Sequence, residues 1–355
     1  MEKRRVQLVG RSTLTISLPT IWARKTGIKK GDFVTILTER DGSLRIVHRP
    51  EETETDGKTI TINADQCQER GLISRLIITG YVRGYDRIVI TSSKRIGNES
   101  LKAIRDAEFM LLGLSIIEET PTSMTLQCSI DSSSHPIDTV IRRLYLLFST
   151  MYDEDVQALI ESRTDLAEEA RRREHQANRV YALILRLLNQ AQSDSSTALK
   201  IGISDATNIL NIVIIANALE RMADWADKIA ENIILLNNLG VELSDNIGAR
   251  IVRYSSNVKD IFEKIMKSLF TKSIEQANAA INHFEDGVET ETNKIIDQLR
   301  IENIYHGFRE IERIVGALHR IGENAVTIAL TIINAISTEK DRSDSSRIPA
   351  LKYLF

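Results

Sequence analysis

The spacing of apolar and polar residues changes once along this chain, near Pro136. Before it, apolar positions often recur every second residue, the period of a β-strand; after it they recur every three or four, the period of an amphipathic helix. The next proline is Pro349, so the chain between them lacks the strongest helix breaker. The pattern predicts six helices, at residues 137–161, 164–191, 203–238, 244–270, 273–299 and 301–337, with Ser204-Asp205 and Ser244-Asp245 as N-caps.

Residues 4–49 show the pattern of a small β unit. Asp41-Gly42 separates two apolar runs, which is a strong hairpin signal. Residues 19–25 fit a short helix that Gly27 closes, and residues 50–58 are acidic and typical of a linker. The strand period is carried by Val6, Leu8, Leu14, Ile16 and Leu18.

Residues 59–130 predict a small α/β unit. The glycines of this region are too scattered to form the phosphate-binding loop of nucleotide-binding proteins. Strands are expected at 59–63, 114–118 and 124–130 and a helix at 100–112, while the runs 74–79 and 87–90 fit either a strand or a buried helix.

The helical region contains an internal repeat. Residues 218–231 (ALERMADWADKIAE) and 317–330 (ALHRIGENAVTIAL) are identical at six of fourteen positions, and residues 174–180 pair with 289–295 upstream. Residues four apart on a helix are neighbours, so each copy places polar side chains together on an otherwise apolar helix. We expect two antiparallel three-helix bundles.

Charge is unevenly distributed along the 355 residues. Residues 1–50 hold 11 Lys or Arg and 4 Asp or Glu, a net charge of +7, which leaves −10 on the remainder. A basic head on an acidic body suggests a nucleic-acid-binding module joined to other domains. Cys67 and Cys128 form no metal or redox motif, no signal peptide follows Met1, and no apolar run reaches the roughly 20 residues that span a bilayer. We expect a cytoplasmic protein without membrane insertion.

Two family resemblances rest on particular residues. The segment RSTLTISLP at 11–19, with Gly31-Asp32 and Asp41-Gly42, resembles the AbrB/SpoVT swapped-hairpin domain. The segments ALERMAD at 218–224 and LHRIGENA at 318–325 resemble the PhoU third-helix motif, written roughly LERIGDHA. Together they resemble archaeal PhoU-type phosphate uptake regulators with an AbrB-like N-terminus.

The resemblance implies functions for both parts. AbrB-like domains dimerise by interlacing hairpins and bind DNA through basic residues, because Arg and Lys contact phosphate and Arg also reads guanine. PhoU proteins regulate phosphate uptake by contacting the phosphate ABC transporter or its signalling partners. The predicted DNA-binding residues are Arg4, Arg5, Arg11, Arg24 and Lys25; the alternatives are ordinary surface charge, or a domain that only dimerises.

Several PhoU proteins also bind metal clusters through Glu/Asp-xxx-Asp pairs, so the resemblance implies a divalent or iron-type metal ion. Carboxylates suit such cations, and Glu220 and Asp224 preserve an acidic pair. The alternative is a solvated face, or pairing with Arg221. The first repeat's set is Glu174, Asn178, Glu220 and Asp224, and the second repeat's is Glu289, Asn293, His319 and Glu323, with Asn in place of an acid in both. The arginines at 171–173 are expected on a solvated helix face, or against an acidic partner.

We therefore predict a multidomain homodimer. Residues 1–50 form an AbrB/SpoVT-like DNA-binding and dimerisation domain, 57–131 a small α/β domain, 136–238 and 241–338 two all-α PhoU-like three-helix bundles, and 339–355 a tail.

The predicted function is regulation of phosphate uptake, as a DNA-binding transcriptional regulator whose PhoU-like domains sense or contact the phosphate transport system. The alternative is a metal-binding helical-bundle scaffold that contacts protein partners without binding DNA. We expect no enzymatic activity. Di-iron enzymes of this architecture use Glu-x-x-His pairs, whereas His319 precedes Glu323 by four residues.

Overall fold

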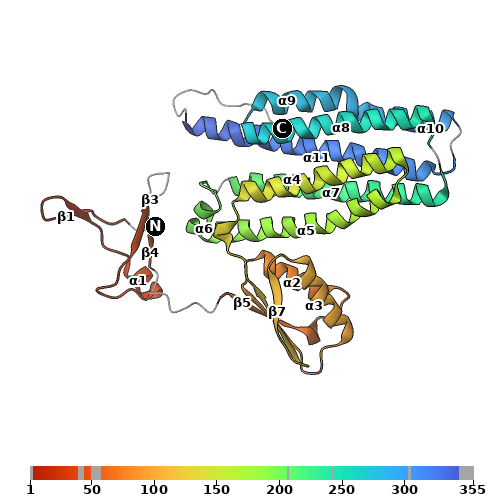
Figure 1. Cartoon of the computed structure of the whole chain (residues 1–355). Helices are drawn as coiled ribbons and strands as arrows, with labels where there is room; N and C mark the ends of the chain where they lie inside the picture. Colours follow the sequence, from red (N-terminus) through yellow and green to blue (C-terminus); the bar gives the residue numbers. More distant parts are fainter. Residues whose placement is uncertain are drawn as a thin grey trace. The chain divides into compact units, whose positions relative to one another are not determined.

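The computed structural model describes residues 3–38, 44–48, 57–205, 208–241, 243–302 and 305–343. The chain divides into two compact units, Met1–Asp56 and Gly57–Phe355 (Figure 1). None of the described helices is long and apolar enough to cross a membrane.

The first unit consists of two small antiparallel sheets and one helix. Strand β1 (Gln7–Val9) pairs with β2 (Thr13–Thr15), and β3 (Thr35–Thr38) pairs with β4 (Leu44–Val47). Helix α1 (Thr20–Thr26) ends at Gly27, which adopts φ 75°, as the sequence predicts. The turn at Asp41-Gly42 lies outside the described residues, but the strands on either side of it pair as a hairpin requires.

The described part of the first unit contains no buried side chain. Many of its large apolar residues are exposed, from 54% at Ile16 to 94% at Phe33. A unit of this size buries too little by itself to be stable, and exposed apolar side chains in such number are typical of an interaction surface. These side chains therefore need cover from outside the unit. The exposed residues are Val6, Leu8, Val9, Leu14, Ile16, Ile21, Phe33, Ile36 and Leu44.

We predict that residues 1–50 form a dimer that covers this surface. Sedimentation of the isolated fragment at micromolar concentration should give twice the monomer mass. Leu14→Asp should weaken the dimer because it buries a charge, whereas Ser12→Asp, which adds the same charge in the neighbouring turn, should not. A folded monomer in the unsubstituted fragment would contradict the prediction.

The second unit begins with an α/β subdomain. Its four strands are β5 (Thr59–Asn63), β6 (Arg87–Thr91), β7 (Leu114–Glu119) and β8 (Ser123–Cys128), in the order β5-β6-β8-β7 with only β5 and β6 parallel. Helices α2 (Leu72–Val82) and α3 (Asn98–Met110) follow β5 and β6. Two short 3-10 turns lie at Ala64–Gln66 and Ser132–Ser134.

The two ambiguous runs of this subdomain adopt different structures. In α2 the buried residues Ile73, Ile77 and Tyr81 recur every four positions and form a helical stripe. In β6 burial alternates, with Ile88 and Ile90 fully buried. The run 74–79 is therefore helix and the run 87–90 is strand.

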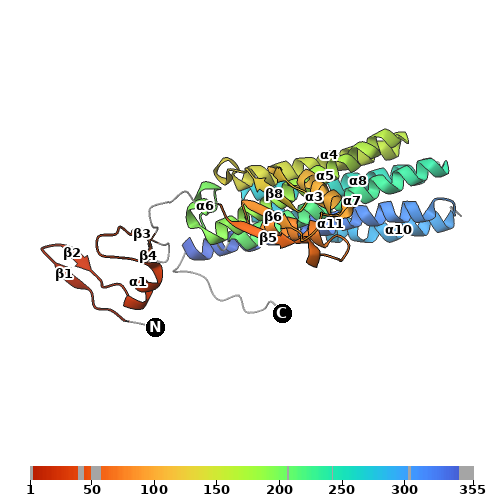
Figure 2. The ribbon, with the colours of Figure 1, turned by 90° about the horizontal axis from the view of Figure 1, so that it is seen from below.

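The rest of the second unit is helical. Helices α4 (Ile137–Glu161), α5 (Thr164–Ser193) and α7 (Asn208–Leu239) pack against one another, with the short α6 (Ser195–Lys200) between α5 and α7 in sequence. Helix α8 (Asp245–Thr271) packs with α9 (Ile274–His283), α10 (Glu289–Ile301) and α11 (Phe308–Ser343). Helix α7 packs along α11 and joins the two groups (Figure 1), and their long axes run in similar directions (Figure 2).

Three predicted helices differ from the structure at their ends or centres. The helix predicted at 203–238 begins later, at Asn208. The short helix α6 precedes it, and Asp194 caps α6 by accepting hydrogen bonds from the N–H groups of Ser196 and Thr197. The segment 273–299 is interrupted by a π-helical turn at Phe284–Val288. The predicted helix 301–337 begins later, at Phe308. The expected cap at Ser244 is present, accepting from Ile247 N–H.

The π-helical turn serves a close contact between helices. It brings the Phe284 ring over Gly322 of α11, where a Cβ atom would lie 2.5 Å from the ring. Glycine at 322 is therefore needed for this approach, and a single π-turn can redirect a side chain without ending the helix.

A buried arginine joins the α/β subdomain to the bundle. Arg186 of α5 is 1% exposed, and its Nη1 donates to the carbonyls of Tyr81 and Tyr85 at 2.8 Å each. Its Nη2 donates to Asp86 Oδ1 at 3.3 Å. A buried charge is tolerated only when it is paired and hydrogen-bonded, so these bonds set how the subdomain lies on α5.

We predict that Arg186→Met destabilises the protein. The substitution leaves the Tyr85 carbonyl without its donor, whereas the Tyr81 carbonyl keeps the N–H of Gly84. Because one unpaired carbonyl costs about 1–3 kcal/mol, the free energy of unfolding should fall by roughly 1–3 kcal/mol. Urea unfolding measures this change. Arg172→Met on the same helix is the control, because surface ion pairs contribute about 0–1 kcal/mol. Equal losses in both variants would contradict the prediction.

Candidate functional site

The four metal-site residues predicted in the first repeat lie on two packed helices. Glu174 and Asn178 belong to α5, and Glu220 and Asp224 belong to α7. Asn178 Nδ2 donates to Glu174 Oε1. His175 Nδ1 lies 3.1 Å from the other carboxylate oxygen of Glu174. Three carboxyl groups and one amide therefore form an acidic face on α5 and α7.

The carboxyl groups of this acidic face resist ionisation together. The pKa of Glu220 is raised to about 7, first by burial and then by the charges of Asp224 and Glu174, against the opposing effect of Arg221. Burial also raises the pKa of Glu174, to which Asp227 and Asp224 contribute. The pKa of Asp224 is raised by partial burial and by Asp227. Desolvation and like charge thus act in the same direction here.

A third helix, α4, adds a carboxyl group that the sequence analysis missed. Asp155 of α4 is fully buried, and neither of its oxygens has a hydrogen-bond partner among the described residues. Burial, then Asp227 and Glu154, raises its pKa well above the ordinary value. The available signal was an acid at a core position of helix 137–161, between Tyr152 and Ala158 in the apolar stripe.

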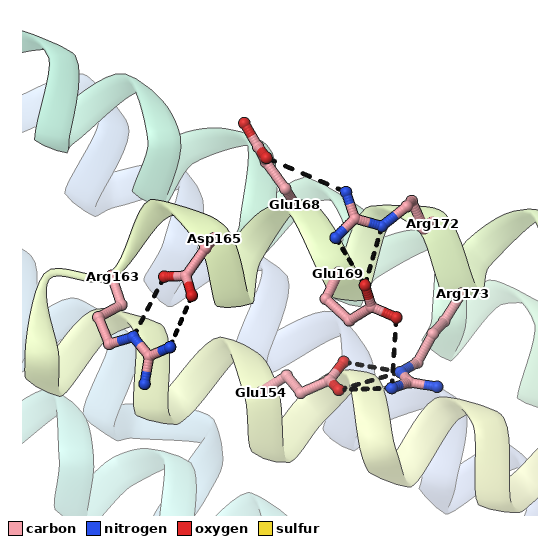
Figure 3. Close-up of polar contacts among 7 residues, drawn as sticks. All are labelled: Glu154, Arg163, Asp165, Glu168, Glu169, Arg172 and Arg173. Carbon is pink, nitrogen blue, oxygen red and sulfur yellow. Dashed lines mark hydrogen bonds and ion pairs between the residues drawn. The ribbon is translucent and has the colours of Figure 1, made fainter.

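The arginines at 171–173 surround the acidic face with ion pairs. Arg173 lies 2.9 Å from Glu154 of α4 (Figure 3), and Arg171 lies 2.9 Å from Asp227 of α7. The middle one, Arg172, pairs with Glu168 and Glu169 of the same helix. The outer two therefore meet acidic partners within the chain, and only the middle one fits the solvated face expected from the sequence.

The second repeat forms a weaker counterpart. His319 Nε2 lies 3.6 Å from Glu323 Oε1 on α11, and Arg320 pairs with the same carboxylate at 2.7 Å. The imidazole stacks on Phe284 and its Nδ1 is buried without a hydrogen-bond partner among the described residues. Asn293 is exposed on α10, and the side chain of Glu289 lies outside the described part. Glu323 is thus already paired with a cation.

The charge of the acidic face suits a metal ion, but the positions of its side chains do not form a coordination site. Mutually repelling, desolvated carboxyl groups favour a cation. However, within the described residues no group of three or more His, Cys, Asp and Glu side chains is arranged to hold one. The metal sites of both repeats remain predictions.

The predicted DNA-binding residues are all exposed in the first unit. Arg11 occupies the β1–β2 turn, and Arg24 and Lys25 lie in the last turn of α1. Arg4 donates to Ser17 Oγ at 3.4 Å. Exposure makes these side chains, with Arg5, accessible to a polyanion, and DNA contact remains a prediction.

Comparisons with known proteins identify a family for the first part of the helical region. The PhoU domain family matches residues 141–233, which cover α4 to α7. The crystal structure of PhoU from Pseudomonas aeruginosa is similar at 20% identity and a TM-score of 0.49, over 57% of this chain and 96% of that chain. No curated protein matches.

The chain therefore contains a PhoU domain at residues 141–233. This confirms the PhoU resemblance for that segment. The AbrB-like character of residues 4–49 and the archaeal type of the combination remain predictions.

The pKa of Glu220 predicts a pH dependence of stability. In the folded protein this carboxyl keeps its proton up to about pH 7, against an ordinary value of 4.5. The folded state thus binds more protons between these values, so the free energy of unfolding should fall as pH rises through this window and level off above it. Glu220→Gln should reduce the difference between urea unfolding at pH 5 and pH 8.

Glu168→Gln on the exposed surface of α5 is the control and should leave that difference unchanged. If the change in unfolding free energy between pH 5 and pH 8 is the same in the unsubstituted protein and in Glu220→Gln, Glu220 has the same pKa in the folded and unfolded states.

Proposed function

We propose that this protein regulates phosphate uptake through its PhoU domain, by contacting phosphate ABC transporter components or their signalling partner. The observation that carries the proposal is the PhoU domain at residues 141–233.

Deletion of the gene tests this proposal. In phosphate-rich medium the deletion strain should continue to take up radiolabelled phosphate at the rate of starved cells, and the full chain should restore repression. Uptake that is unchanged by deletion at both high and low phosphate would refute it.

We propose further that the first unit acts as a dimeric DNA-binding module. Three observations support this: the net charge of +7 over residues 1–50, the exposure of the basic side chains, and the uncovered apolar surface. A dimer doubles the number of phosphate contacts that one molecule makes.

We predict salt-sensitive DNA binding by the full chain. Each neutralised phosphate contributes a slope of about 0.9 in the plot of log affinity against log salt. Replacing Arg4, Arg5 and Arg11 by Ala should therefore weaken binding and flatten the slope, as measured by fluorescence anisotropy on promoter fragments.

The matched control replaces three exposed arginines of the helical region, Arg143, Arg172 and Arg253, by Ala. It removes the same charge and should keep the wild-type slope. If both triple variants behave alike, the effect reflects net charge and not a DNA-binding surface.

A second candidate function is a cation-binding scaffold that contacts proteins without DNA. The observation that favours it is the raised pKa of Glu220, about 7, among neighbouring acids. The residues that would hold the ion are Glu174, Glu220 and Asp224.

We predict that any bound metal depends on the first repeat more than the second. Asp224→Ala should remove most of the metal retained after dialysis at neutral pH, and Glu323→Ala should remove less, because Glu323 is already neutralised by Arg320. Plasma emission spectrometry measures the content. Equal metal in the wild type and Asp224→Ala would mean that the acidic face holds none.

A further inference from the structure

A second polar site lies on α7, where it packs against α11. A pocket of about 470 Å³ opens between these helices. It belongs to neither predicted metal set, and its volume lies within the range of about 300–1,000 Å³ that is usual for small-ligand sites. Its polar and aromatic wall consists of Trp225, Lys228, Glu231 and Asn232 from α7 and Arg313 and Arg320 from α11.

The pocket is positively charged. Its lining holds three cations and one carboxylate, and the carboxylate of Glu323, which pairs with Arg320, reduces the net charge of the site from +2 to +1. Lys228 pairs with Glu231 at 2.8 Å, and Arg320 pairs with Glu323 at 2.7 Å. Arg313 forms no ion pair with any described residue, so its guanidinium is available to an anion. A guanidinium presents several N–H donors and suits phosphate oxygens.

The pocket also contains an unsatisfied acceptor. Asn232 is 3% exposed, and its Nδ2 donates to the Lys228 carbonyl at 2.7 Å. Its Oδ1 is buried without a hydrogen-bond partner among the described residues. Buried acceptors are rarely left unpaired. Because Asn232 lines the pocket, a ligand in the pocket could donate a hydrogen bond to this oxygen. Glu231 is a further acceptor on the same wall.

A site that holds both the Arg313 cation and the Asn232 acceptor suits an anion that can also donate a hydrogen bond. Inorganic phosphate keeps at least one hydroxyl at neutral pH. Sulfate has none, and phosphate monoesters, with a second pKa of about 6, have largely lost theirs. From this combination of groups we infer that the pocket between α7 and α11 binds inorganic phosphate, with Arg313 holding the oxyanion and Asn232 accepting from its hydroxyl.

The wall of α11 leaves room for such a ligand. Gly316 lines the pocket, and a Cβ atom at this position would meet nothing within 4 Å. Glycine is unfavourable inside a helix, so a larger side chain here should fill the pocket without weakening α11. This inference deepens the proposed function by naming its signal, but the binding itself does not depend on that function.

Trp225 provides a direct probe of binding. The chain has two tryptophans, so Trp22→Phe leaves Trp225 as the reporter in the full-length protein. Potassium phosphate is titrated at constant ionic strength into protein dialysed against EDTA, and calorimetry checks the fluorescence. Parallel titrations use sulfate and AMP. We expect saturation by phosphate, with at least tenfold weaker binding of both other anions.

Variants test each element of the site. Arg313→Gln should weaken phosphate binding at least tenfold, and Gly316→Leu should abolish it while circular dichroism and the unfolding midpoint are retained. Asn232→Leu should bring the affinities for phosphate and sulfate closer together. Arg253→Gln, on the exposed side of α8, removes the same charge elsewhere and should bind phosphate normally.

Three results would overturn the inference: no saturable response to phosphate, equal affinity for sulfate, or unchanged binding in Arg313→Gln and Gly316→Leu. The uptake experiment on the deletion strain is independent. Phosphate binding with unaltered uptake would refute the proposed function alone, and altered uptake without phosphate binding would refute this site alone.

Discussion

The packing of α7 is the constraint on which the helical region depends. This helix contacts α4, α5 and α11, so most of its circumference is buried, with alanines such as Ala216, Ala223 and Ala230 allowing close approach. A helix with several packed neighbours has few positions left for polar side chains. Those positions lie along two sides of α7. One side, the acidic seam, carries Glu220, Asp224 and Asp227, and the other side, the basic seam, carries Lys228 of the pocket.

The acidic seam is stabilised by its surroundings more than by its own members. Burial and mutual repulsion oppose ionisation of its carboxyl groups, as the raised pKa of Glu220 shows. Arg171 and Arg173 offset part of this cost by pairing with Asp227 and Glu154. Asp155 lies behind these pairs without a partner among the described residues, and protonation spares it the larger cost of a buried charge.

The sequence predicted those features that depend on local pattern. The helix 137–161 has the predicted ends, because Pro136 precedes it and Ser162 ends it in the left-handed conformation. The repeat predicted that Glu174 and Asp224 share one face. The break at Phe284–Val288 was not predictable, because it depends on Gly322 of another helix. The contacts of Arg186 and the pocket at Arg313 also join residues that lie far apart in the chain. A local pattern of apolar and polar positions cannot predict such contacts.

The two seams of α7 share one charge. Lys228 Nζ lies 3.9 Å from Asp227 of the acidic seam and 2.8 Å from Glu231 of the pocket. An anion that draws this ammonium group toward the pocket weakens its attraction to Asp227, and a cation or proton on the acidic seam has the opposite effect on the competition for Lys228. Such coupling is reciprocal, because each ligand must change the affinity for the other by the same factor. A single helix turn can therefore connect an anion site between the bundles with the acidic face of the PhoU domain.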